Sequence, residues 1–374
     1  METGFMRRIF LAFGILMLLV QGCASGRAPK HGTQSSAVWV PRKNYALVRV
    51  YYATDRNRTS NDAPARMFGC DYGDLSYGTC LVGIPRDHRM GELESPSIWR
   101  IQLNPDPNKD VVLLQIIPQD RTNFLDAVNS EIDKSPGKRA FVFIHGFNIT
   151  FEEAARRTAQ LSYDLGFEGA PVFYSWPSHG NVFAYTKDEQ SIEYSERHLE
   201  EFLNDFAVNS DATNIYVIAH SMGCHALAVA FASLAAEHPA AAKRFKEIIM
   251  AAPDIDSVVF KTQIAPQIIS TNSPFVTVYA SSNDRALAIS RSLYNGHQRL
   301  GESLPAPTVI PGMDTIDATA VDTSFIGHSY VGDDRSVISD LYYLLETGES
   351  LEQFRRAGLV RVGTDPDEYW KIRR

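Results

Sequence analysis

Cysteine is scarce in this chain, with only four among 374 residues, and positive charge is in deficit. No cysteines and histidines stand at the spacings of a structural zinc site, so we expect no metal and no other cofactor. Lys and Arg number 36 against 44 Asp and Glu, for a net charge of −8, which argues against nucleic acid as a partner. Internal repeats and low-complexity blocks are absent. The chain as a whole is 44% hydrophobic and 21% charged, which is the composition of a globular protein with a sizeable core.

The N-terminus carries a short apolar run, from Ile9 to Val20, preceded by Arg7-Arg8. The run is too short to span a bilayer but suits the hydrophobic region of a signal peptide. It ends at Gln21-Gly-Cys23-Ala-Ser, which resembles a bacterial lipobox, in which the cysteine is lipidated. We therefore expect residues 1–22 to be a signal peptide and Cys23 to carry a lipid anchor. A plain secretory signal, with Cys23 incidental, stays open as the alternative.

This reading places the protein outside the cytoplasm. An exported, lipid-anchored chain is expected in the bacterial cell envelope, attached to the outer membrane and facing the periplasm. In that compartment Cys70 and Cys80 could form a disulfide that closes a ten-residue loop. Cys224 is expected to be a buried, inert thiol.

The chain divides into five parts by composition. Residues 23–44 read as a flexible tether, 45–110 as a β-rich N-terminal extension, 111–347 as the main domain, and 348–374 as a polar C-terminal tail, with a helix followed by surface chain. Strand-like runs in the extension are Tyr45–Ala53, Leu75–Ile84 and Trp99–Leu103.

Strand and helix patterns alternate in the main domain. Strands are expected at 111–117, 139–144, 171–175, 214–219, 247–251, 275–280 and 314–318, and helices at 123–132, 151–165, 189–206, 222–237, 256–269, 285–293 and 333–345. Such alternation predicts an α/β fold with a mostly parallel central sheet and helices on both faces.

Ser221 occupies the most informative position in the sequence. The apolar strand 214–219 runs into Ser221, small residues stand at Ala219 and Gly223, and a helical pattern begins at once. This is the strand–turn–helix pattern of a nucleophile elbow, close to G-x-S-x-G, with Ala219 in place of the first glycine. The sequence therefore predicts a nucleophilic serine. The alternative is an ordinary strand–helix turn whose serine only caps the helix.

A nucleophilic serine needs a base, and the base needs an acid to orient it. Asp284 follows the strand 275–280 and His328 follows the last expected strand, in the chain order Ser, Asp, His that this kind of site uses. We predict these two as acid and general base. Asp254 is the alternative acid, and His297 is a weaker competitor for the base.

Two backbone amides are expected to form the oxyanion hole. One belongs to Met222, directly after the serine, and the other to Phe147, in the loop that follows the strand 139–144. His145 and Asn148 of that loop, with Trp176 after the next strand, are candidates for lining the site, and His145 is expected mainly to hold the loop.

These motifs together resemble the α/β-hydrolase superfamily. The run from about residue 139 to 345 carries the likeness, in His145-Gly-Phe-Asn148, Ala219-His-Ser-Met-Gly223 and the loops of Asp284 and His328. More narrowly, the chain looks like a bacterial family of predicted α/β hydrolases without an assigned substrate. The segments that carry this narrower likeness are Pro85–Glu92, Tyr174–Pro177, Ala251–Asp254 and Ser282–Leu287. The resemblance implies the fold and a hydrolase activity, and it implies no substrate.

We therefore expect an envelope serine hydrolase, resembling carboxylesterases or lipases. Its partner would be a small-molecule or lipid acyl ester, with amide and thioester substrates left open, and its oligomeric state is undetermined. A protein from another class fits the same pattern: a catalytically silent binding module of the cell envelope built on the hydrolase scaffold.

Overall fold

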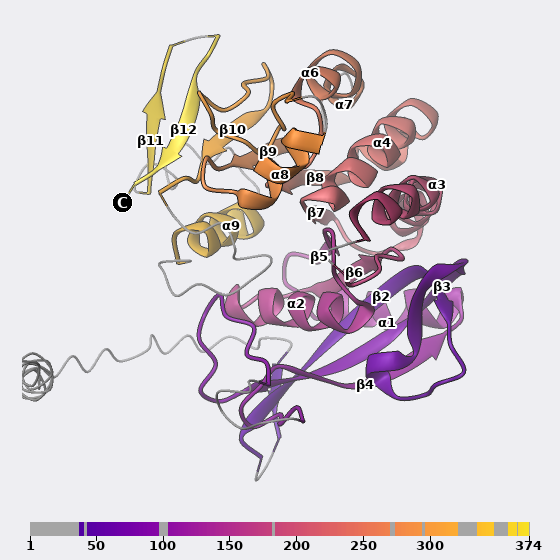
Figure 1. The fold of residues 1–374 in the computed structure, drawn as a ribbon. Coiled ribbons are helices and arrows are strands. Elements are labelled where there is room, and N and C mark those ends of the chain that lie inside the picture. The colour runs from indigo at the N-terminus through magenta and orange to yellow at the C-terminus, as the bar shows by residue number, and fades with distance from the viewer. Residues whose placement is uncertain are drawn as a thin grey trace, which may run out of the picture. The chain divides into compact units, whose positions relative to one another are not determined.

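The computed structural model describes residues 37–40, 43–96, 104–181, 184–269, 274–293, 296–320, 335–347, 358–364 and 366–373. They form one twelve-stranded sheet in the order β11-β12-β10-β9-β8-β7-β5-β6-β2-β3-β4, with β1 paired to β2 (Figure 1). The strands are β1 (Ala37–Trp39), β2 (Tyr45–Arg58), β3 (Phe68–Pro85), β4 (Val112–Gln119), β5 (Arg139–Ile144), β6 (Ala170–Ser175), β7 (Asn214–His220), β8 (Phe245–Ala251), β9 (Phe275–Ala280), β10 (Asp314–Asp317), β11 (Leu359–Val362) and β12 (Tyr369–Ile372). Parallel pairing runs from β2 through β6, β5, β7, β8, β9 and β10 to β12.

Helices follow most of the central strands. They are α1 (Arg121–Ile132), α2 (Phe151–Asp164), α3 (Tyr185–Asn209), α4 (Met222–Glu237), α5 (Pro239–Ala242), α6 (Ser257–Val259), α7 (Ala265–Ile269), α8 (Arg285–Leu293) and α9 (Arg335–Thr347), with a 3₁₀ turn at Pro64–Arg66. None of the helices within the described ranges is both long and apolar enough to cross a bilayer. The α/β architecture expected from the sequence is confirmed.

The helix expected over 256–269 is interrupted. A π-helical turn, Phe260–Ile264, separates α6 from α7. Pro266 has no N–H to donate to the Thr262 carbonyl, which favours a wider turn at this point.

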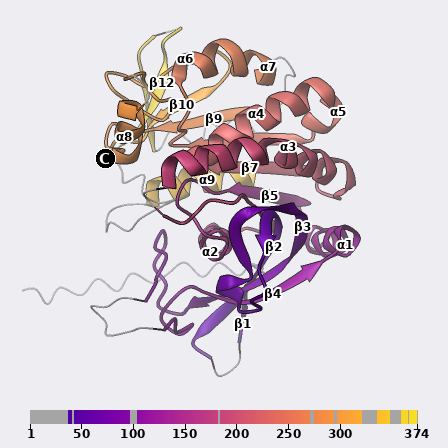
Figure 2. The ribbon, with the colours of Figure 1, turned by 45° about the vertical axis from the view of Figure 1, so that its right-hand side comes forward.

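Both faces of the sheet are covered, because side chains of a strand alternate between its two faces. In β5, Ala140, Val142 and Ile144 pack with residues of α1, α3, α4 and α7, whereas Phe141 and Phe143 pack with residues of α2 and α9. Figures 1 and 2 show these two helical layers. A central strand buried on both sides explains why 139–144 reads as a continuous apolar run.

The N-terminal strands extend the same sheet rather than covering it. β2 lies parallel to β6, with Thr54 opposite Ser175, and β3 pairs with β2 and β4 in antiparallel directions. Because β2 is parallel to β6, its carboxyl end reaches the edge of the sheet where β5, β6 and β7 also end. This position allows β2 to contribute side chains to the site described below.

The expected disulfide between Cys70 and Cys80 is wrong. Both cysteines are free, and both lie in the single long strand β3. Ten residues of strand span about 33 Å, whereas a disulfide requires Cα atoms within about 7 Å. Burial raises the pKa of the Cys80 thiol, which makes it unreactive.

The surface tail expected at the C-terminus is wrong for the described part of 348–374, whereas residues 348–357, the first part of that segment, lie outside the described residues. Residues 359–362 and 369–372 are strands: β11 and β12 pair in antiparallel directions, and β12 adds to β10. Leu359 and Ile372 are 4% and 3% exposed, and both belong to the core. Only a few apolar residues mark these strands, which is why composition suggested a polar tail.

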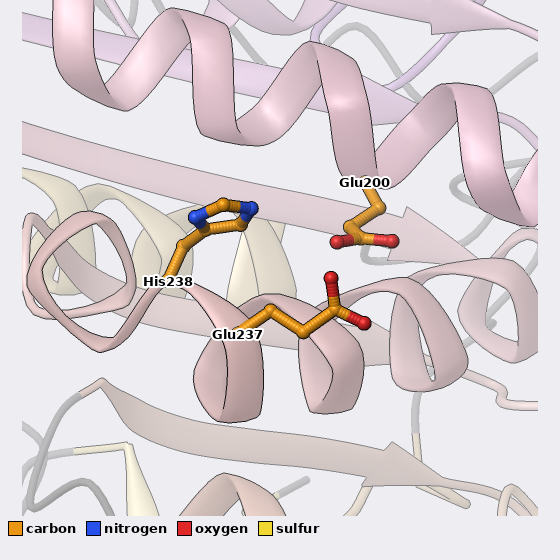
Figure 3. A group of neighbouring side chains, drawn as sticks. All are labelled: Glu200, Glu237 and His238. Carbon is orange, nitrogen blue, oxygen red and sulfur yellow. The ribbon is translucent and has the colours of Figure 1, made fainter.

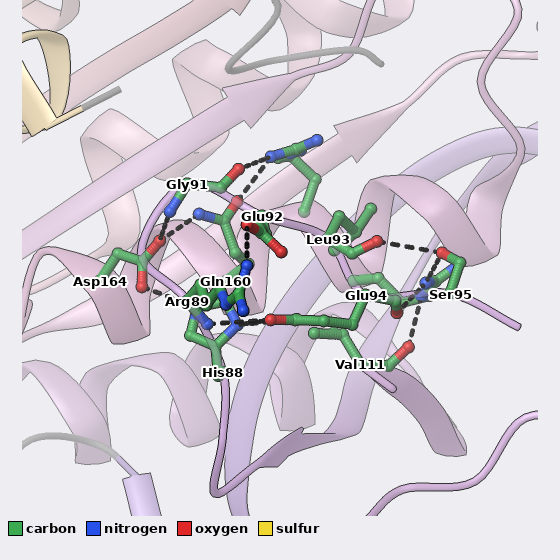
Figure 4. Close-up of polar contacts among 12 residues, drawn as sticks. His88, Arg89, Gly91, Glu92, Leu93, Glu94, Ser95, Val111, Gln160 and Asp164 are labelled. Carbon is green, nitrogen blue, oxygen red and sulfur yellow. Dashed lines mark hydrogen bonds and ion pairs between the residues drawn. The ribbon is translucent and has the colours of Figure 1, made fainter. Parts of the chain in front are cut away.

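A charged cluster fastens the segment after β3 onto α2 (Figure 4). His88 lies between two carboxylates, with Nδ1 2.8 Å from Glu94 Oε2 and Nε2 2.8 Å from Asp164 Oδ1. Asp164 also accepts a hydrogen bond from the Gly91 amide at 2.7 Å. Burial by itself would lower the pKa of His88, but the hydrogen bonds to Asp164 and Glu94 raise it to about 9.

This cluster predicts a pH-dependent stability. Since the pKa of His88 is raised from 6.5 to about 9 on folding, its contribution is complete below about pH 6.5 and is lost as pH rises through about 9. In urea unfolding, the stability gap between wild type and His88→Gln should shrink by up to about 3 kcal/mol between pH 6 and 10. His297→Gln, at an exposed histidine, is the control. A gap that stays constant over this range would contradict the prediction.

Candidate functional site

Ser221 lies at the turn between β7 and α4, in a backbone conformation that side chains rarely adopt. Its φ is 50° and its ψ is −121°. The Ser221 amide donates to the Ala251 carbonyl at 2.9 Å, and its carbonyl accepts from the amides of Cys224 and Asp254 at 3.0 and 3.2 Å. These bonds hold the strained residue from both sides. The geometry is that of a nucleophile elbow, in which the serine side chain stands out from the turn.

Two glycines allow this turn to approach the loop after β5. A Cβ atom on Gly223 would lie 2.3 Å from the His145 carbonyl oxygen. A Cβ atom on Gly146 would lie 2.7 Å from His220 Nδ1 and 3.0 Å from Ser221 Cβ. Real Cβ atoms essentially never make contacts as short as 2.3 or 2.7 Å, so glycine is favoured at both positions. Ala219, by contrast, is fully buried in β7 and belongs to the hydrophobic core.

The two amides predicted for the oxyanion hole have no partner within the part of the chain that the structure describes. The backbone N–H of Met222 and that of Phe147 donate to none of these residues, although Cys224, Asn148 and Ile149 next to them all do. Asn148 has a φ of 60°, which turns the chain immediately after Phe147. Unused amides beside a strained serine are suited to binding an oxyanion.

His145 and Trp176 pack against each other and hold the loop that follows β5. The two rings stack at 5.1 Å, and Trp176 Nε1 donates to the His145 carbonyl at 2.8 Å. His145 Nδ1 lies 2.9 Å from the Gly146 carbonyl, and its Nε2 lies 3.0 Å from Ser175 Oγ. Burial first, and then the nearby Arg56, holds the pKa of His145 well below its usual value. A neutral, fully hydrogen-bonded imidazole fits the structural role expected for it.

Arg56, at the end of β2, was missed by sequence reasoning. Its guanidinium is buried, and it donates to the carbonyls of Ile149, Ser178 and Gly69 at 2.7 to 2.9 Å and to Ser175 Oγ at 2.8 Å. One cation thus joins the loops that follow β5 and β6. The polar run Thr54–Arg58 at the end of an apolar strand is the signal that could have indicated it.

Asp188, in the first turn of α3, binds the same two loops, those that follow β5 and β6. Sequence reasoning missed this residue as well. It is fully buried. Its carboxylate accepts from Ser178 Oγ at 2.6 Å, from the His179 amide at 2.9 Å and from the Asn148 amide at 3.4 Å. Nothing in the local sequence distinguishes it from the other acidic residues of a long helix.

Asp254 and Asp284 have very different surroundings. Asp254 is 5% exposed and accepts from Arg299 Nε at 2.6 Å, Ser290 Oγ at 2.6 Å and Tyr185 OH at 2.7 Å. Asp284 caps α8 by accepting from the Leu287 amide at 3.0 Å. Burial, together with the charge of Asp254, raises the pKa of Asp284.

The two carboxylates differ in the number of side chains that donate hydrogen bonds to them. No side chain in the described ranges donates to Asp284, whereas three side chains satisfy Asp254. The carboxylate of Asp284 is therefore the one of the two that still has hydrogen-bonding capacity for another group.

The remaining predicted residues fall into two groups. His328 and Cys23 lie outside the described residues. His297 is described, with a side chain that is 59% exposed and 3.6 Å from Asp256. Cys224, expected to be inert, is buried beside the elbow, and burial raises the pKa of its thiol.

The parallel sheet with helices on both faces, and the sharp turn between β7 and α4, define an α/β-hydrolase fold. The family described as alpha/beta hydrolase of unknown function (DUF900) matches residues 120–344, more than half of the chain. The chain belongs to this family. No curated protein matches it.

The solved structures that match this chain are distant from it in sequence. The wild-type protein AbyA5 is 12% identical, with 83% of this chain and 70% of that chain covered and a TM-score of 0.33. An esterase of Pyrobaculum calidifontis is 12% identical, with 78% and 86% covered and a TM-score of 0.30. Lipase B of Aspergillus fumigatus is 14% identical, with 53% and 48% covered and a TM-score of 0.27.

The strain at Ser221 predicts an unusual preference for glycine. Such a conformation costs about 1–3 kcal/mol in a residue with a Cβ atom, against about 0.5–1 kcal/mol for the flexibility of glycine in the unfolded chain. Ser221→Gly should therefore be more stable than Ser221→Ala by about 1 kcal/mol in urea unfolding.

The matched control is Ser233, inside α4, where the order should reverse. There the glycine variant should be less stable than the alanine variant by about 1 kcal/mol. If alanine proved more stable than glycine at position 221 as well as at position 233, the turn at Ser221 would not be strained.

Proposed function

We propose that this protein is a serine hydrolase of the esterase or lipase type. Ser221 is the nucleophile, His328 the general base, Asp284 the acid that orients it, and the amides of Met222 and Phe147 form the oxyanion hole. The observation that carries the proposal is the backbone of Ser221, with φ 50° and ψ −121° at the start of α4. A serine that only capped the helix would have no need of a strained conformation.

The surrounding packing supports this reading. Gly146 and Gly223 bring the turn of Ser221 against the loop that carries Phe147, so both amides can approach the same substrate oxygen. Arg56 and Asp188 fix that loop through buried hydrogen bonds. Donors held in place before the substrate arrives stabilise a developing negative charge without further reorganisation.

These proposed roles define the reaction. Ser221 Oγ attacks the carbonyl carbon of an ester, and His328 takes the hydroxyl proton. The C–O bond to the leaving alcohol then breaks, and His328 returns the proton to that oxygen. Water attacks the resulting acyl-enzyme, again with His328 as base, and releases the carboxylic acid and free Ser221.

Asp284 is the better acid because it still has hydrogen-bonding capacity. A carboxylate whose pKa is raised by burial is stabilised when an imidazolium forms beside it. Asp254 already has Arg299 as its counter-ion at 2.6 Å, so a second cation would gain less there.

The proposed location and substrate rest on the sequence. A lipid on Cys23 would tether the enzyme to the outer membrane, with acyl esters of the envelope within its reach. The preferred acyl chain is best found with a panel of esters of graded length.

The nucleophile is tested with a fluorophosphonate probe, which phosphonylates an activated serine with loss of fluoride. We expect one label per wild-type chain, measured by intact mass, and none on Ser221→Ala. Ser292→Ala, an exposed serine on α8, should label like wild type. Absence of labelling in a folded wild type would instead favour the catalytically silent binding module.

The acid is tested by comparing Asp284→Asn with Asp254→Asn. Asp284→Asn should lower kcat on a p-nitrophenyl ester by up to about 10⁴-fold, because the base loses its orientation, with little change in KM. Asp254→Asn should mainly lower the thermal midpoint, because it removes the buried ion pair between Asp254 Oδ1 and Arg299 Nε at 2.6 Å. If a folded Asp254→Asn shows the large loss in kcat and Asp284→Asn does not, the assignment of the acid is wrong.

A further inference from the structure

A second group of side chains gathers between α3 and the end of α4, outside the site above. Glu200 comes from α3, Glu237 is the last residue of α4, and His238 follows it (Figure 3). One ligand atom from each residue lies within 4.8 Å of the other two. The group is remote from Ser221, since the sixteen residues of α4 separate the two by about 24 Å.

Glu200 lacks a counter-ion in this position. The residue is only 6% exposed, and its carboxylate accepts no hydrogen bond from any side chain or amide in the described ranges. It faces the carboxylate of Glu237 instead (Figure 3). The nearest basic residue on the helix, Arg197, is paired with Glu201 at 3.0 Å. A largely buried carboxylate that faces a second one is destabilised unless a cation or a proton neutralises its charge.

The end of α4 adds to the demand for positive charge. Glu237 and His238 lie at the C-terminus of the helix, where the last carbonyl groups concentrate negative partial charge. Glu237 and His238 are both exposed, so an ion can reach them from solvent. Two carboxylates and an imidazole therefore surround one point, next to the end of α4.

We propose that Glu200, Glu237 and His238 bind a divalent transition metal, with Zn²⁺ the best fit. Imidazole and carboxylate together suit Zn²⁺, whereas Mg²⁺ prefers oxygen ligands alone. Three protein ligands would leave a fourth tetrahedral position for water. The ion would join α3 to the end of α4 and neutralise the buried carboxylate.

The geometry requires only a small adjustment. Ligand atoms about 2.1 Å from a tetrahedral zinc ion lie about 3.4 Å apart. The present ligand atoms lie within 4.8 Å of one another, so they must contract by at most about 1.4 Å. Glu237 and His238 can supply this movement because their side chains are exposed. Glu200, being buried, would remain the fixed ligand.

Binding is tested on the full chain after removal of metals by chelation and dialysis. Calorimetric titration with Zn²⁺ should show a saturable site whose dissociation constant rises at least about tenfold in Glu200→Gln and in His238→Ala. His297→Ala, which removes an exposed histidine outside the group, should bind like wild type. Binding that is absent from wild type, or unchanged in both ligand variants, would overturn the proposal.

Thermal unfolding gives a second test that does not depend on those affinities. Without metal, Glu200→Gln should melt at a higher temperature than wild type, because it removes the unpaired charge. With Zn²⁺ the midpoint should rise for wild type and not for the variant, and Mg²⁺ should not replace Zn²⁺. A metal-free Glu200→Gln that melts below wild type would mean that the carboxylate already has a stabilising partner, which contradicts the site.

Discussion

The contact between the turn at Ser221 and the loop after β5 is the constraint on which the site depends. The Cα of Gly223 lies so close to the His145 carbonyl that no side chain fits between them. Ser221 itself is kept in its strained conformation by backbone hydrogen bonds with Ala251 at the end of β8, with Cys224 and with Asp254. Strain of about 1–3 kcal/mol persists only where the surrounding structure fixes it in this way.

The loop after β5 is in turn held by charges that are buried beneath it. Burial lowers the pKa of Arg56 to about 10, so the guanidinium stays protonated at neutral pH. It reaches carbonyl groups of two loops, while Asp188 binds amides of the same loops. His145 stays neutral beside this cation, which avoids a second buried positive charge. A rigid network of this kind gives the amides of Phe147 and Met222 fixed positions.

Local patterns were sufficient where a residue's role depends on its neighbours along the chain. The apolar run 139–144 became β5, the helix after Ser221 spans 222–237 as predicted, and the strand before it ends one residue later than predicted, at His220. Patterns failed where partners are distant. Arg56 reads as one more charge after a strand until β2 is placed beside β6. Residues 358–373 contain too few apolar positions to reveal that β12 completes the sheet beside β10. The spacing of Cys70 and Cys80 is compatible with a loop closed by a disulfide. It does not reveal that both residues lie in one extended strand, β3.

The sequence by itself determined the class of fold, the elbow and the order of the candidate triad, because the alternation of strand and helix and the small residues around Ser221 are properties of the local chain. Only the tertiary structure decided which carboxylate is already neutralised, which amides are unused, and which charges support the loop. It alone also brings Glu200 to the end of α4, thirty-seven residues along the chain from Glu237. The physical reason is that burial, hydrogen-bond partners and electrostatic neighbours depend on segments that meet only when the sheet and its helices are packed together.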